Sequence, residues 1–89
     1  MKRPAIRCRN GMVSSPHYLA SNAGLRVLME GGNAVDAAIA TNAVLNVVYP
    51  HMCGVGGDAF FLIYDAKSGK LVGLNASGRA PAGASIDFY

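Results

Sequence analysis

An arginine near the C-terminal end has the residue type and setting best suited to binding chemistry. Arg79 is the only charged residue between Ala76 and Ser85, in a segment otherwise made of alanine, serine, glycine and proline. A guanidinium presents a planar fork of donors that can hold a carboxylate through two parallel hydrogen bonds. Arg79 is therefore a candidate for carboxylate binding, and a surface or structural arginine is the open alternative.

A glycine-rich run offers a second candidate, the sequence Gly54-Val55-Gly56-Gly57. A phosphate-binding P-loop continues with Lys-Ser/Thr and then a helix. Here Asp58 and an apolar run follow instead, so the nucleotide interpretation is poor. We predict a helix-to-strand turn that needs positive φ at glycine.

Serine and histidine residues lie close together at Ser14, Ser15 and His17. Members of a catalytic triad are brought together by the fold and need an orienting third group, so this proximity does not predict one. We interpret the serines as capping hydroxyls and His17 as a solvent-facing histidine. His51 has no further ligands at metal-binding spacing and is interpreted as a structural imidazole. We expect no metal and no organic cofactor.

Composition limits the kind of protein to which these residues belong. Eighty-nine residues make at most one small domain. Hydrophobic residues make up 52% and charged residues 15% of the chain, against roughly 25% charged in typical soluble domains. So much apolar material predicts that the chain either oligomerises or belongs to a larger core, with residues 1–89 as a single partial domain.

Charge and cysteine content exclude several classes of partner. The net charge is +3, and five of the eight basic residues lie in the first third without the interleaved aromatics of a nucleic-acid-binding face. Polar residues such as Asp36 interrupt the longest apolar segment, so we expect no membrane span. No apolar run follows the basic start, which predicts no signal peptide and a cytoplasmic location. Cys8 and Cys53 are expected to be free, partly buried thiols, with a disulfide between them as the open alternative.

The first half of the chain predicts a strand and two helices. Residues 11–15 are interpreted as a short strand or its end, with Ser15 capping a helix that has Pro16 at its first position. Gly31-Gly32 ends that helix. Asn33 caps a second helix, from about Ala34 to Val48, with Asp36 completing a capping box. That helix is apolar nearly all round, which predicts burial on most sides.

The second half predicts a β-hairpin. Residues 59–64 form an apolar run without clean alternation, which is typical of a strand covered on both faces. Residues 65–70 form the turn and residues 71–75 the returning strand. Residues 76–85 are predicted to be loop, and residues 86–89 the start of another element. No internal repeat and no linker dividing domains is present.

These pieces, in this order, resemble a known enzyme family. GMVSSPHYLAS, GGNAVDAAIATNAVLNVVYPHMCGVGGDAFFLIYD and GRAP are similar to the start of the large subunit of γ-glutamyltransferases, also called γ-glutamyltranspeptidases. The resemblance covers about residues 11–85. It implies an α/β (α+β) chain, a fragment of the αββα N-terminal-nucleophile hydrolase fold, contributing two helices and one hairpin. It also places the glycine loop near the catalytic cleft.

The resemblance implies the chemistry as well. The family's nucleophile is a threonine, freed when a longer precursor cleaves itself, and it lies outside this chain. The substrate would be a small γ-glutamyl or acyl amide, as in glutathione. The macromolecular partners would be the remaining large-subunit sequence and the small subunit that carries the threonine. The resemblance assigns no catalytic residue to these 89 residues, so this chain alone is expected to be inactive.

One departure from the family pattern affects substrate binding. Family members have the pattern Asp-x-Arg-Glu-x-Ala-Pro, in which the arginine binds the substrate α-carboxylate. Aligned on Ala80-Pro81, that arginine falls on Ser77, and Arg79 is shifted by two residues. Ser77 and Arg79 are therefore the candidate substrate-binding residues. The departure also favours an amidase or acylase with altered acyl specificity; a non-catalytic module that binds a partner through its apolar helix is the third hypothesis.

Overall fold

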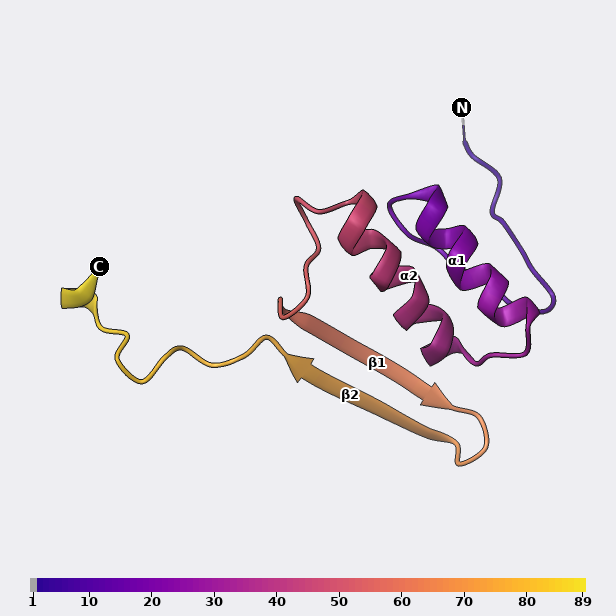
Figure 1. The fold of residues 1–89 in the computed structure, drawn as a ribbon. Coiled ribbons are helices and arrows are strands. Elements are labelled where there is room, and N and C mark those ends of the chain that lie inside the picture. Colours follow the sequence, from indigo (N-terminus) through magenta and orange to yellow (C-terminus); the bar gives the residue numbers. More distant parts are fainter. Residues whose placement is uncertain (1) are drawn as a thin grey trace. The chain divides into compact units, whose positions relative to one another are not determined.

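The computed structural model describes residues 2–89. These divide into two compact units, and the boundary in the sequence falls between Val55 and Gly56. The first unit contains α1 (Tyr18–Met29) and α2 (Ala34–Val48), and the second contains the strands β1 (Ala59–Asp65) and β2 (Lys70–Ala76) followed by the short 3₁₀ helix η1 (Ile86–Phe88) (Figure 1). The two predicted helices and the predicted hairpin are therefore confirmed. Among the described residues, no helix is long and apolar enough to cross a membrane.

Small side chains form the contact between the two helices. The buried residues recur at every fourth position, which puts them on one face of each helix: Ala20 and Gly24 on α1, and Ala37, Thr41 and Leu45 on α2. A methyl group on Gly24 would collide with the Thr41 hydroxyl and lie 3.1 Å from the Ala37 carbonyl oxygen. The absence of a side chain at Gly24 therefore permits the close approach of α1 to α2.

The start of α1 differs from the prediction. His17, not Ser15, is the N-cap, and its Nδ1 accepts a hydrogen bond of 3.2 Å from the Leu19 amide. Pro16 consequently lies before the cap and not at the first helical position. The Ser15 hydroxyl instead donates to the His17 carbonyl at 2.8 Å and bonds the Ser21 hydroxyl at 2.7 Å. Because this hydroxyl is engaged there, it supports the entry into the helix and does not cap it.

The connection between the helices has the predicted stop and start signals. Gly31 adopts a φ of 94°, and the Gly32 and Gly31 amides donate to the carbonyls of Val27 and Leu28. These two bonds make a Schellman motif, which satisfies carbonyls at the end of α1. Asn33 then begins α2 in a complete capping box with Asp36, with bonds of 2.9 and 3.0 Å.

The hairpin is antiparallel, with Ala59 opposite Ala76 and Asp65 opposite Lys70. The Asp65 carboxylate organises the turn by accepting hydrogen bonds from the Ser68 hydroxyl at 2.6 Å and the Lys67 amide at 3.1 Å. These bonds lower the pKa of Asp65 below the ordinary aspartate value, and the hydrogen bond from Ser68 has the largest effect. Gly69 completes the turn with a φ of 68°.

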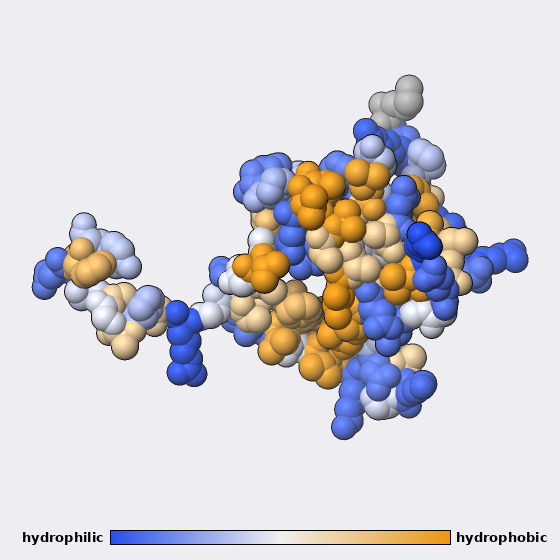
Figure 2. Space-filling model, in the orientation of Figure 1, coloured by the Kyte–Doolittle hydropathy of each residue, from blue (hydrophilic) through white to orange (hydrophobic). Residues whose placement is uncertain are grey.

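Large hydrophobic side chains are exposed on both units, as the orange areas of Figure 2 show. Phe60 and Leu62 of β1 are 72% and 76% exposed, and Ile39 and Val47 of α2 are 63% and 78% exposed. The sequence predicts that β1 is covered on both faces and α2 on most sides. Neither is covered in this way within residues 2–89, and burial of β1 and α2 in the intact protein stays a prediction.

The strand expected at residues 11–15 is absent from the secondary structure. The segment is extended but pairs with no other strand among the described residues. The prediction is wrong for this chain because a β-strand is defined by its partner as well as by its own backbone.

Candidate functional site

The loop that follows β2 carries both predicted substrate-binding residues. The Asn75 side-chain oxygen accepts a 3.0 Å hydrogen bond from the Ser77 amide, which turns the chain as the strand ends. Gly78 follows with a φ of 83°, a backbone conformation that side chains with a Cβ rarely adopt. Ser77 and Arg79 thus flank a glycine turn, and both are exposed.

Arg79 keeps its hydrogen-bond donors available for a ligand. The one ion pair among residues 2–89 joins Arg26 to Glu30 at 3.0 Å on the exposed surface of α1, and no side-chain hydrogen bond in this part of the chain involves Arg79. An exposed guanidinium without such partners can bind a carboxylate through two parallel hydrogen bonds. Ser77 could add only a neutral hydroxyl. The structure brings the two residues into one loop and does not join them to a catalytic group.

The glycine-rich run behaves as a turn between elements. Gly56 has a φ of 84°, and β1 begins at Ala59 without an intervening helix. The positive φ confirms the predicted need for glycine at this position. The run therefore lacks the helix N-terminus that a P-loop uses to bind phosphate.

His17 and His51 each contact a neighbouring group of this chain. The Nδ1 atom of His17 is occupied as an acceptor for the Leu19 amide. His17 was predicted to face solvent, but it is half-buried. Its ring stacks on that of Tyr18 with the centroids 4.9 Å apart. His51 packs edge-on against Tyr49 at 4.4 Å. No three His, Cys, Asp or Glu side chains within residues 2–89 are grouped to hold a metal ion.

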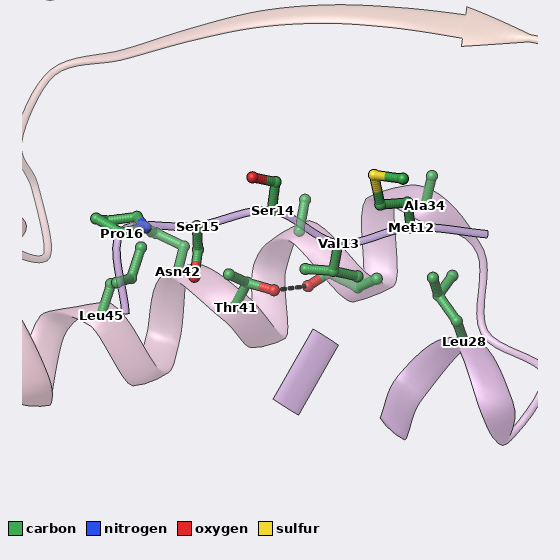
Figure 3. A pocket seen from close by; sticks show the side chains of 12 residues that line it. Met12, Val13, Ser14, Ser15, Pro16, Leu28, Ala34, Thr41, Asn42 and Leu45 are labelled. Carbon is green, nitrogen blue, oxygen red and sulfur yellow. Dashed lines mark hydrogen bonds between the residues drawn. The ribbon is translucent and has the colours of Figure 1, made fainter. Parts of the chain in front are cut away.

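A groove in the helical unit was not predicted from the sequence. Its volume is about 350 Å³, and it runs between the extended segment before α1 and one side of α2 (Figure 3). Leu28 and Leu45 are the largest apolar side chains on its helical wall, and Asn42 is a polar group there. No local signal in the sequence points to the groove, because its walls come from segments far apart in the chain.

Residues 20–89 match the family model described as Gamma-glutamyltranspeptidase. The chain is 53% identical over 78 residues to the Glutathione hydrolase-like YwrD proenzyme of Bacillus subtilis, covering 88% of this chain and 15% of that protein. It is 45% identical over 80 residues to the Oxamate amidohydrolase proenzyme of Klebsiella pneumoniae, covering 90% of this chain and 15% of that protein.

A solved structure shares the backbone arrangement. The γ-glutamyltranspeptidase of Helicobacter pylori superposes with a TM-score of 0.82 at 41% identity, over 92% of this chain and 23% of that one. The present chain thus spans about one seventh of the curated relatives' length and about one quarter of the solved chain.

Proposed function

Because the chain belongs to the γ-glutamyltranspeptidase family, we propose that the complete protein transfers or hydrolyses γ-glutamyl groups of glutathione-type substrates. The carrying observation is the 53% identity to a glutathione hydrolase-like proenzyme over 88% of the chain. The two helices and the antiparallel hairpin are part of the N-terminal-nucleophile hydrolase fold. That fold is consistent with amide chemistry of this kind.

The proposed mechanism is covalent catalysis in two steps. The hydroxyl of an N-terminal threonine, outside these 89 residues, attacks the amide carbonyl while its own α-amine takes the proton. The carbon–nitrogen bond breaks, the amine leaves with a proton, and an acyl-enzyme ester forms. Water or an acceptor amine then attacks the ester and frees the threonine. The names of the relatives as proenzymes support a nucleophile released by processing.

The first test compares the complete processed protein with the 89-residue chain, using turnover of a γ-glutamyl anilide. We expect turnover by the complete protein and none by the 89-residue chain, because no threonine of this chain occupies a family nucleophile position. Turnover by the highly purified short chain that is lost on a point mutation within it would contradict the proposal. A strong dimer of the short chain, with no longer protein encoded, would instead favour a partner-binding module.

Within this chain, Arg79 is the proposed carboxylate-binding residue. Its support is the exposed, unpaired guanidinium beside the Gly78 turn. A hydrogen bond to a charged group is worth roughly 1.5–3 kcal/mol, which corresponds to about 10- to 150-fold in kcat/KM. We expect Arg79→Ala in the complete protein to reduce the preference for a γ-glutamyl donor over its analogue without the α-carboxylate by about that factor.

The matched control for Arg79→Ala is Lys67→Ala, which removes an exposed cation from the hairpin turn, where its side chain makes no hydrogen bond among the described residues. It should leave the donor preference unchanged. If the wild-type protein discriminates strongly for the carboxylate and Arg79→Ala keeps that ratio, a residue beyond position 89 binds the carboxylate and the assignment of Arg79 fails.

A second candidate function is an amidase or acylase with altered acyl specificity. It is favoured by Ser77 at the family arginine position and by the 45% identity to an oxamate amidohydrolase. A serine hydroxyl cannot supply a charge-assisted, two-pronged bond. On this alternative Ser77→Arg should raise kcat/KM for γ-glutamyl donors and lower it for the native acyl amide. An unchanged γ-glutamyl kcat/KM in Ser77→Arg would remove position 77 from the specificity argument.

A further inference from the structure

Asn75 lies where β2 passes into the loop that carries Arg79. It is the last residue but one of β2, and it pairs with Phe60 of β1. The antiparallel ladder therefore fixes the backbone of Asn75, whereas the residue itself is exposed. Asparagine is depleted in strands, so its presence here needs an account other than strand propensity.

The side chain of Asn75 ties the loop to the strand. Its Oδ1 atom accepts a 3.0 Å hydrogen bond from the amide of Ser77, two residues further along the chain. Among residues 2–89, no other hydrogen bond from backbone or side chain involves residues 77–80. The bond between Asn75 and Ser77 is therefore the one hydrogen bond that connects this part of the loop to the hairpin.

Gly78 fixes the direction in which the chain continues from this bond. Its φ of 83° is in the left-handed region, which residues with a Cβ rarely adopt. A Cβ at Gly78 would meet no atom within 4 Å, so backbone conformation and not crowding requires the glycine. The chain is thus held at Ser77 and turned at Gly78 immediately before it reaches Arg79.

We propose that Asn75 is a positioning residue that acts through Arg79 in the recognition of the substrate α-carboxylate. This inference rests on the proposed carboxylate-binding role of Arg79. A two-pronged bond between a guanidinium and a carboxylate is directional, and a loop already held in its bound conformation loses less entropy when the substrate binds. In this account Asn75 does not contact the substrate: its Oδ1 atom holds the Ser77 amide, and the Arg79 guanidinium contacts the carboxylate.

The alternative is that the Asn75 bond serves only the fold at the end of the hairpin. Asparagine side chains commonly close turns by bonding the backbone two residues on. A purely structural role would lower the amount of folded protein, and so the turnover of every donor by the same factor. A positioning role instead changes the preference between donors with and without the carboxylate, so the two roles predict different measurements.

The test measures kcat/KM of the complete, processed protein for a γ-glutamyl anilide and for its analogue without the α-carboxylate. The ratio of the two values is the carboxylate preference. Asn75→Ala should lower this preference by about 2- to 12-fold, the range expected for one neutral hydrogen bond. Asn75→Ser keeps a neutral oxygen that can accept from the Ser77 amide more weakly, so its preference should lie between those of the wild type and Asn75→Ala. An unchanged preference in Asn75→Ala, or one in Asn75→Ser no higher than in Asn75→Ala, would overturn the inference.

Ser68→Ala is the matched control, because it removes a side-chain hydrogen bond from the turn at the other end of the hairpin. It should leave the carboxylate preference unchanged. A fall as large as that in Asn75→Ala would assign the effect to general loosening of the hairpin and would overturn the positioning role of Asn75.

The double variant Asn75→Ala with Arg79→Ala separates this inference from the proposed function. If Asn75 acts through Arg79, the double variant should have the same preference as Arg79→Ala alone. A further fall would show that Asn75 acts independently of Arg79 and would overturn the inference. A preference that is absent from the wild type, or that survives Arg79→Ala, would contradict the carboxylate role of Arg79 and this inference with it. A preference that falls in Arg79→Ala but not in Asn75→Ala would overturn this inference alone.

Discussion

At the residue scale, Gly24 sets how closely the helices approach. A side chain there would collide with the Thr41 hydroxyl, which donates a 2.7 Å hydrogen bond to the Ala37 carbonyl. Gly24→Ala should therefore destabilise the complete protein by about 1–3 kcal/mol, although alanine is the better helix former. Urea unfolding midpoints measure the effect, with the exposed Asn22→Ala on the same helix as the control. Equal midpoints for the two variants would show that the helix pair relaxes to admit the methyl group.

Residue-level predictions were correct where the signal was local. Gly31 and the Asn33–Asp36 box could be read directly, because a helix end is specified by the residues that make its hydrogen bonds. The cap of α1 was assigned to Ser15 because serine is a preferred capping residue, whereas the His17 imidazole takes that role. The roles of Ser77 and Arg79 depend on a bound substrate and stay predictions.

At the element scale, the hairpin turn depends on the ionised Asp65 carboxylate. Its pKa is lowered by the Ser68 hydroxyl and then by the Lys67 amide. Because the pKa of Asp65 is lower in the folded than in the unfolded chain, its ionised carboxylate stabilises the turn at pH values above its unfolded pKa, which is about 4. This stabilisation is lost as the pH falls through the folded pKa. We expect Ser68→Ala to raise the Asp65 midpoint in an NMR titration, with Ser85→Ala as the control. The same midpoint in wild type and Ser68→Ala would contradict this account of the turn.

Elements were predictable where their own residues define them. Both helices and the hairpin were found because periodicity, caps and turn residues are contained in short segments. The strand at Gly11–Ser15 was predicted and is absent here, because pairing depends on a second segment. The groove on α2 was missed for the same reason.

At the scale of the whole molecule, one side of the apolar helix α2 is exposed in this chain. Ala38 lies on that side and lines the groove. If the intact protein covers α2, Ala38→Asp should be among its most damaging single changes, because an unpaired buried charge costs several kcal/mol. The unfolding midpoint of the complete protein measures this, with Ala66→Asp in the exposed hairpin turn as the control. A complete protein carrying Ala38→Asp with an unchanged midpoint would show that this side of α2 faces water.

The Schellman motif and the capping box also bear on the order of folding. All hydrogen bonds of these two motifs, which form the connection between α1 and α2, lie between Val27 and Asp36 in the sequence. The helix contact itself lies between Ala20 and Leu45. Contacts so close in sequence have a low loop-closure cost and form quickly. Because a chain is synthesised from its N-terminus, the helix pair can assemble on the ribosome before the residues that follow it have been made.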